Sequence, residues 1–190
     1  MIKKTLLFLF LLKSYYFGQI YEIKIWGVTI ASVNQNIKKN QIKYSVKSEG
    51  IIDLIWPVKN FYSTTFDSTN YNIINFEKNI YQKNFKSNSI ANYSHDNILI
   101  YNKKDSVKLK KNTKTIFSLL SKVQNKPYLD LDTKWFNYEH EREIGKARFL
   151  WADSILIWDG IDSIMCDHYR LDIKLNNINN FCQYIGRSYP

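Results

Sequence analysis

Glycine, cysteine and histidine are scarce in this chain. Its 190 residues include 6 glycines, 2 cysteines and 3 histidines, and the glycines are not clustered. The sequence therefore lacks the glycine-rich loop that cradles phosphate groups in nucleotide-binding proteins. A zinc site needs several ligands at close spacing, and His95, His140 and His168 have no such partners along the chain. We expect neither a metal nor a cofactor.

Familiar catalytic motifs are missing too, because the chain has no GxSxG elbow and no HExxH pair. Carboxylates do alternate along Asp130–Asp132 and Glu139–Glu143, and on a strand each set would share one face. Like charges placed in this way raise one another's pKa, and glycosidases use such pairs, though usually from separate strands. The neighbouring residues are basic, which indicates an ordinary charged and exposed surface. We therefore expect no enzyme.

Long apolar runs are also absent, and the longest, Leu6–Leu12, is far shorter than the roughly 20 residues of a membrane-spanning helix. Two lysines precede this run and the small residue Gly18 follows it, which is the layout of a secretory signal peptide. The sequence thus predicts a signal peptide over residues 1–19, a single β-rich domain over residues 20–190 and no transmembrane span in the mature chain. An apolar first strand of a cytosolic protein is the alternative.

Export would bring both cysteines into an oxidising compartment. A disulfide between Cys166 and Cys182 is therefore one prediction, and two separate thiols are the other.

Arginine is rare, with 4 residues against 23 lysines. The net charge of +10 would fall to +7 on removal of Lys3, Lys4 and Lys13 with the signal peptide. Proteins that recognise nucleic acids favour arginine because its guanidinium forms bidentate hydrogen bonds with bases and phosphates. The lysines of this chain are scattered. We expect no nucleic-acid partner.

What the chain does contain is alternating apolar and polar residues, the period of β-strands. One helix is predicted over Thr113–Val123, where Ile116, Leu119, Leu120 and Val123 form an apolar stripe and Thr113 or Thr115 can cap the start. Strands are predicted at Tyr21–Val33, Gln41–Ser48, Ile51–Ile55, Phe61–Asp67, Tyr71–Phe76, Ile80–Phe85, Ile98–Tyr101, Ser106–Leu109, Lys134–Tyr138, Ala147–Ala152, Ser154–Trp158 and Ile164–Leu175. The predicted fold is mainly β: a strongly curved antiparallel sheet or an open β-barrel, with one helix packed on or in it.

Four landmarks in this order resemble a known family: Trp26–Val28 with Ala31, Gly50–Asp67, Ile116–Val123 followed by Pro127, and Ile161–Ile173. Together they resemble the bacterial envelope family called domain of unknown function 3108. The resemblance implies an exported protein, in the periplasm or cell envelope of a Gram-negative bacterium, with a curved antiparallel sheet wrapped partly around a helix. It implies no established activity.

Aromatic residues make up 16% of the chain, including five tryptophans. They can fill the core of a β domain, or they can line an apolar pocket on the concave face of a curved sheet. For the second case the predicted lining is Trp56, Phe61, Tyr62, Trp151 and Trp158.

We accordingly expect a non-enzymatic envelope protein that binds a hydrophobic or amphipathic partner, such as a lipid or a lipoprotein. The alternatives are a structural or interaction subunit of an envelope complex, and an enzyme that acts on envelope polymers through Asp130 and Asp132.

Overall fold

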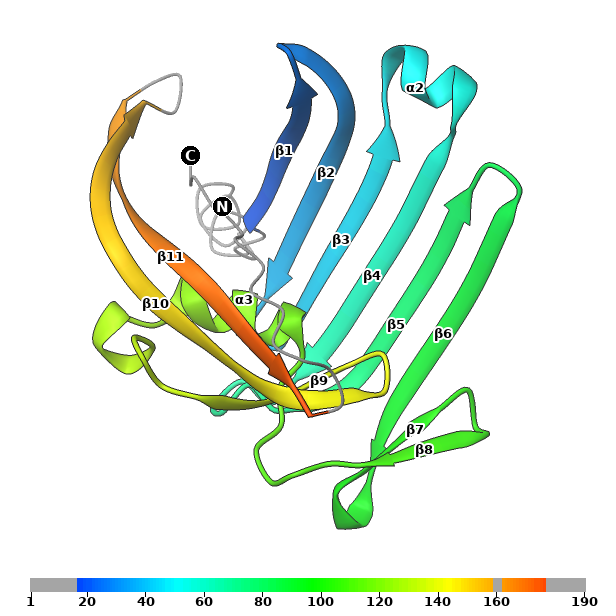
Figure 1. The fold of residues 1–190 in the computed structure, drawn as a ribbon, viewed down its shortest axis with the longest axis vertical. Coiled ribbons are helices and arrows are strands. Elements are labelled where there is room, and N and C mark those ends of the chain that lie inside the picture. Colours follow the sequence, from blue (N-terminus) through cyan, green and yellow to red (C-terminus); the bar gives the residue numbers. More distant parts are fainter. Residues whose placement is uncertain (1–16, 159–161, 177–190) are drawn as a thin grey trace, which may run out of the picture.

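The computed structural model describes residues 17–158 and 162–176 of the chain, which form a mainly β protein with two antiparallel sheets (Figure 1). The strands are β1 (Phe17–Ile25), β2 (Val28–Lys38), β3 (Gln41–Ser48), β4 (Val58–Phe66), β5 (Ile73–Gln82), β6 (Phe85–Ser94), β7 (Ile98–Tyr101), β8 (Asp105–Lys108), β9 (Phe136–His140), β10 (Glu143–Trp158) and β11 (Ser163–Leu175). The helices are α2 (Gly50–Ile55) and α3 (Ile116–Asn125), with short 3-10 turns η2 (His95–Asn97) and η3 (Tyr128–Asp130).

The large sheet is an eight-stranded meander in which β1 to β8 pair in sequence order. Every neighbouring pair is antiparallel. The β1–β2, β3–β4 and β5–β6 connections therefore lie together at one end of the sheet, as Figure 1 shows at the top. Within the described residues β1 does not pair with β8, so the sheet is not closed into a barrel.

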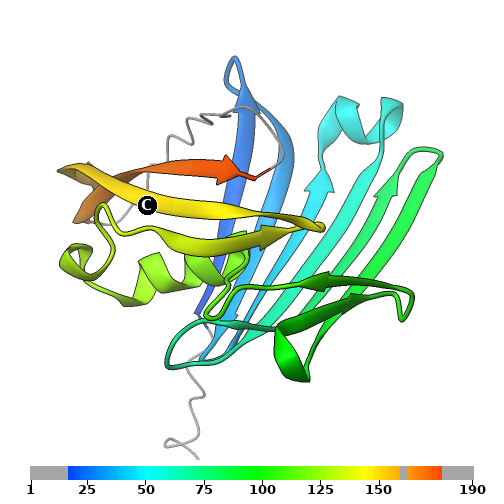
Figure 2. The same cartoon turned by 60° about the horizontal axis from the view of Figure 1, so that its bottom comes forward.

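The small sheet has the order β11-β10-β9 and crosses the large sheet with α3 beneath it (Figure 2). The predicted strands Ala147–Ala152 and Ser154–Trp158 are one strand here, β10, because a bulge at Ala152 shifts the register without ending the pairing with β11. The prediction of a mainly β fold is confirmed, but the single sheet that we expected is two sheets.

The predicted helix is confirmed as α3. Thr115 begins it with a capping box: its side chain accepts a hydrogen bond from the Ser118 amide, and the Ser118 side chain accepts one from the Thr115 amide. Leu119 and Val123 are buried against the small sheet. On its other side the helix presents Phe117 to the large sheet. The helix therefore joins the two sheets through opposite faces.

Two predictions near the start of the chain were wrong. Tyr21–Val33 is not one strand, because Trp26 and Gly27 both have positive φ, of 49° and 80°, and form a tight turn between β1 and β2. Ile51–Ile55 is helical and not extended. Its apolar residues do not alternate with polar ones, so periodicity alone could not separate a helix from a strand.

The region after β4 also differs from prediction. Tyr71–Phe76 and Ile80–Phe85 were expected as two strands, whereas most of both segments belongs to the single strand β5. A turn at Lys83, whose φ is 47°, separates β5 from Phe85, the first residue of β6. The strand β6 that follows was not predicted. Its sequence is dominated by asparagine, serine and lysine, which resemble loop residues in composition.

Residues 1–16 and 177–190 lie outside the described residues, so most of the predicted signal peptide and Cys182 cannot be placed. The strand β1 begins at Phe17 and thus includes the last three residues of that predicted segment. Among them, Gly18 pairs with Asn36 and Gln19 pairs with Gln35. The signal peptide and the disulfide stay predictions.

Candidate functional site

The inner face of the large sheet, defined as the face that meets α3, carries a cluster of aromatic rings. Phe117 of α3 lies 5.4 Å from the rings of both Tyr44 and Tyr62, and 5.9 Å from the ring of Phe76, measured between centroids. These contacts fix the helix across β3, β4 and β5. Part of the inner face is therefore packed core, as one of the two sequence interpretations of the aromatic residues proposed.

A hydrogen-bonded group continues the inner face toward β1. Gln35 is fully buried; it donates to the Tyr44 hydroxyl at 2.5 Å and accepts from the Tyr21 hydroxyl at 3.0 Å. Gln124, near the end of α3, also donates to the Gln35 side-chain oxygen, at 3.3 Å. Buried amides need such partners because unpaired polar groups are costly in the interior. This group fixes the end of α3 beside β1 and β2.

Beside that group lies a cleft of about 540 Å³ between the two sheets. Three parts of the chain form it: β1 and β2, the last turn of α3, and the first half of β11. Its apolar lining residues are Ile37, Val123, Ile164, Met165, Cys166 and Tyr169, and its polar lining residues are Gln19, Gln124, Asn125, Lys126 and Asp167. The volume falls within the range of about 300–1,000 Å³ that ligand pockets usually have.

The five residues predicted to line a pocket do not come together. Tyr62 lies on the inner face and is covered by Phe117. Phe61 lies on the outer face, since side chains alternate along β4, and borders a shallow hollow there with Asn34 and Ser45. Phe61 and Tyr62 therefore lie on opposite faces of the sheet.

The three predicted tryptophans lie at separate places. Trp56 follows α2 at the end of the large sheet, half exposed, with the Lys83 ammonium 5.1 Å from its ring. The Trp151 ring lies 5.5 Å from the Tyr128 ring, measured between centroids, and Trp158 is exposed at the end of β10. None of them borders the cleft between the sheets.

Sequence reasoning missed the cleft residues of β11. Ile164, Cys166 and His168 alternate as a strand should, and this pattern correctly predicted the strand. It could not show that Ile164 and Cys166 would face the end of α3, which is about forty residues earlier in the chain. Cys166 is buried and lines the cleft.

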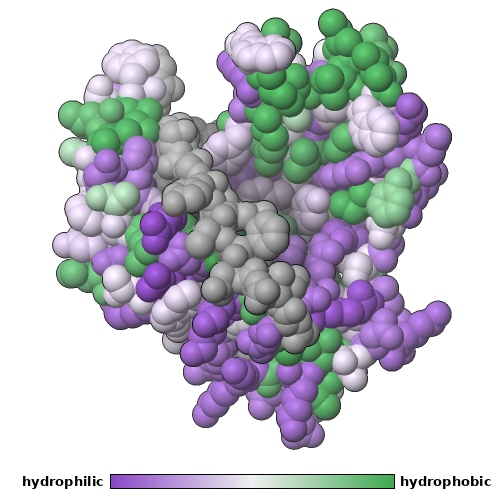
Figure 3. All heavy atoms as spheres, viewed as in Figure 1, coloured by the Kyte–Doolittle hydropathy of each residue, from purple (hydrophilic) through white to green (hydrophobic). Residues whose placement is uncertain are grey.

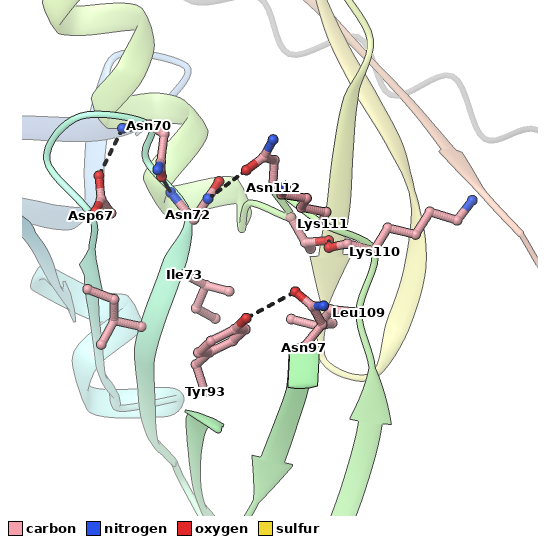
Figure 4. Close-up of a pocket in the computed structure, with 12 residues that line it drawn as sticks. Asp67, Asn70, Asn72, Ile73, Tyr93, Asn97, Leu109, Lys110, Lys111 and Asn112 are labelled. Atoms are coloured by element: carbon pink, nitrogen blue, oxygen red, sulfur yellow. Dashed lines mark hydrogen bonds between the residues drawn. The ribbon is translucent and has the colours of Figure 1, made fainter. Parts of the chain in front are cut away.

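A second cavity, of about 310 Å³, lies toward the β8 edge of the large sheet, between the β4–β5 loop, the end of β6 and Leu109–Thr113 (Figure 4). Its polar groups bond mainly to one another. The Asn72 amide donates to Asn112 at 3.1 Å, and the Tyr93 hydroxyl donates to Asn97 at 3.0 Å. These bonds close the loops on themselves, which favours a structural role for this cavity.

Lys114 lies close to this cavity and is buried. Its ammonium donates to Asn72 at 3.1 Å and to the Asn112 carbonyl oxygen at 3.0 Å. Burial lowers the pKa of Lys114 to about 8, and the positive charge of Lys122 acts in the same direction. No carboxylate lies within ion-pair distance of Lys114 among the described residues.

The Glu139–Glu143 segment was expected to be an exposed strand, and this was wrong. Glu141 and Arg142 have positive φ, of 50° and 77°, and form the turn between β9 and β10. Glu139 is buried, accepts hydrogen bonds from the Tyr101 hydroxyl and from the Arg142 amide, and has its pKa raised mainly by burial. Because Tyr101 belongs to the large sheet, Glu139 joins the two sheets and serves the fold.

The Asp130–Asp132 pair does not share a strand face either. Asp130 ends the turn η3, while Asp132 accepts a hydrogen bond from the Trp151 amide at 2.9 Å. Within the part of the chain that the structure describes, no group of three or more histidine, cysteine or acidic side chains is placed to hold a metal ion. Neither described helix has the length and apolar character needed to cross a bilayer.

Comparisons with known proteins add no assignment. No family model matches the chain, and neither curated proteins nor solved structures gave a significant match. The resemblance to domain of unknown function 3108 thus stays an expectation from the sequence.

Proposed function

We propose that this protein is an exported, non-enzymatic binding protein of the bacterial envelope, which holds a hydrophobic or amphipathic ligand in the cleft between its two sheets. In this proposal the eight-stranded sheet acts as the curved wall of an open half-barrel. The small sheet and α3 form the opposite wall.

The observation that carries the proposal is the cleft itself. Apolar side chains of β2, α3 and β11 line it together with Gln124, Asn125, Lys126 and Asp167, all of which lie outside the predicted signal peptide. A lining that combines apolar side chains with a few polar groups suits a ligand with an apolar chain and a polar head. A cleft of this size accommodates a single chain of that kind, such as the acyl chain of a lipid.

The location is proposed from the sequence. The basic residues and apolar run within residues 1–19 have the layout of a signal peptide, and the four landmarks resemble an envelope family. A ligand with an acyl chain is abundant in that compartment, so the location and the cleft support the same proposal.

A titration with a dansyl-labelled undecanoic acid tests the cleft directly. Ile164→Arg places a guanidinium among the apolar lining residues, and we expect it to weaken probe binding more than tenfold. Ile90→Arg is the matched control, because Ile90 is a partly exposed isoleucine on β6 that does not border the cleft. It should bind the probe within twofold of the unchanged protein.

Equal probe binding by the two variants, or no binding by the unchanged protein, would contradict the proposal. In that case a pull-down from envelope extracts tests the alternative of a structural or interaction subunit, which requires a stoichiometric protein partner.

A further inference from the structure

Apolar side chains gather at the end of the large sheet where the β1–β2, β3–β4 and β5–β6 connections lie together. We call this set the apolar rim: Trp26, Val28, Ile51, Leu54, Trp56 and Phe85. All six are exposed, Trp26 to 98% and Leu54 to 84%. Figure 3 shows the hydrophobic surface over α2 and over the neighbouring end of β1–β2.

The fold does not require these side chains to be apolar. The helix α2 contains no buried residue, and Trp26 occupies a tight turn, where small or polar residues are usual. Exposed leucine, isoleucine and tryptophan on adjoining turns make one apolar patch, and such a patch usually marks an interaction surface. A partner of the rim must therefore supply an apolar environment in which these side chains are buried.

Lysines stand directly behind the rim on the outer face of the sheet. The strand register places Lys47 opposite Lys59, Lys59 opposite Tyr81, and Tyr81 opposite Lys86, so one row crosses β3 to β6. Lys83 adds a further charge in the β5–β6 turn. We call Lys47, Lys59 and Lys86 the lysine row.

The charge of this end is positive and available. Among the described residues, Lys59, Lys83 and Lys86 have no carboxylate within 4.0 Å. The nearby Glu49 accepts a hydrogen bond from Ser32 and lies 4.0 Å from the Lys47 ammonium, and Asp53 accepts a hydrogen bond from Ser48. Lys47, Lys59, Lys83 and Lys86 together carry more charge than these two carboxylates, so this end keeps an excess of positive charge.

The spacing of the two sets matches the layers of a bilayer surface. Lys59 follows Trp56 by three residues, and an extended chain of that length covers about 10 Å. Apolar groups of interfacial proteins enter about 5–10 Å into the headgroup and acyl boundary, while lysines stay at the phosphates. Tryptophan is enriched at this boundary. We propose that the apolar rim docks the protein onto a bilayer surface that contains anionic phospholipids.

This docking is independent of the cleft, because the cleft meets β1 and β2 at Gln19 and Ile37, at the far end of the hairpin from Trp26, and is otherwise formed by α3 and β11. Loss of probe binding in Ile164→Arg and loss of bilayer binding in a rim variant are therefore separate results. Each proposal can fail without the other.

Vesicle flotation of the full chain tests the docking. The protein should float with vesicles of phosphatidylcholine and phosphatidylglycerol in low salt, and bind pure phosphatidylcholine at least tenfold more weakly. Leu54→Asp should reduce binding more than tenfold. Leu129→Asp is the matched control and should bind as the unchanged chain does, because Leu129 is 69% exposed on η3, which follows α3 directly, and α3 lies away from α2 (Figure 1).

Two further variants separate the rim from other apolar segments. Each lysine near an anionic surface contributes about fivefold to binding, so Lys59→Gln with Lys86→Gln should weaken binding more than tenfold. Tryptophan emission should shift to the blue on vesicle binding, and Trp26→Phe with Trp56→Phe should remove that shift.

Equal flotation of the Leu54→Asp and Leu129→Asp variants overturns the proposal, as does a blue shift that survives loss of Trp26 and Trp56. Binding that ignores the lipid charge overturns it as well. A dimer that Leu54→Asp dissociates, without vesicle binding by the unchanged chain, would show that a second copy covers the rim.

Discussion

Replacing Phe117 with alanine should destabilise the fold by removing the aromatic contact between α3 and the large sheet. Its ring lies within 5.9 Å of Tyr44, Tyr62 and Phe76, measured between centroids, so it is the contact of α3 with three strands of the large sheet. Removing a core phenylalanine costs about 3–5 kcal/mol, and a ring that is only partly buried falls at the lower end. We therefore expect a loss of about 3 kcal/mol in the free energy of unfolding.

The assay is equilibrium unfolding in urea, followed by circular dichroism. A loss of about 3 kcal/mol is large against the total of about 5–15 kcal/mol that a typical domain has. Phe117→Leu keeps most of the apolar volume, so its free energy of unfolding should fall by only about 1 kcal/mol. That loss corresponds to the aromatic ring–ring interactions of Phe117.

Phe61→Ala provides the matched control on the outer face. Phe61 is adjacent to Tyr62 but lies away from α3, so its removal should cost about 1 kcal/mol or less. Similar losses for Phe117→Ala and Phe61→Ala would refute the account in which α3 joins the sheets through Phe117. A loss below about 1 kcal/mol for Phe117→Ala would do the same.

Three further predictions concern residues that hold neighbouring elements together. Gly145→Ala should lower the stability by about 3 kcal/mol in a thermal unfolding scan, because the new methyl group would clash with the backbone oxygen of Lys174; an unchanged midpoint would contradict this close approach. Thr115→Ala should cost about 1 kcal/mol through loss of the capping box of α3, and Thr115→Ser should restore most of it. The raised pKa of Glu139 means that its ionised form is disfavoured in the fold, so its contribution to stability is greatest at acid pH and decreases as the pH rises through the folded-state pKa. In Glu139→Gln the amide oxygen can accept the same two hydrogen bonds but carries no charge. The free energy of unfolding of this variant should therefore increase relative to that of the unchanged protein as the pH rises from about 4 to 8. A difference in unfolding free energy that does not change with pH would contradict this role of Glu139.

Local signals in the sequence predicted the local structure well. The stripe of Leu119 and Val123, the cap at Thr115 and the proline after the helix together predicted α3. Alternation predicted most of the strands. These features act within a few residues of one another, so a single sequence contains them in full.

The secondary-structure predictions were wrong where one local sequence pattern is compatible with two backbone conformations. Trp26 is bulky for a tight turn, so the β1–β2 hairpin was interpreted as one strand. The apolar run of α2 suits a helix and a strand alike. The polar residues of β6 resemble a loop, although antiparallel pairing with β5 determines their conformation.

The cleft and the lysine row could not be predicted, because both depend on which strands pair and in which register. The cleft joins Ile37, Val123 and Ile164, which are far apart in the chain. The lysine row exists only because β3 to β6 align Lys47, Lys59 and Lys86. A shift by one residue in any of these pairings would move a lysine to the inner face.

The most direct test of the proposed function is native mass spectrometry of the protein expressed with its own N-terminal segment in a Gram-negative host. The account predicts a lipid-sized mass bound to the unchanged protein and to Ile90→Arg, and its absence from Ile164→Arg. Ligand-free protein in every preparation, or the same bound mass in all three, would contradict the claim that the cleft between the sheets is a ligand site.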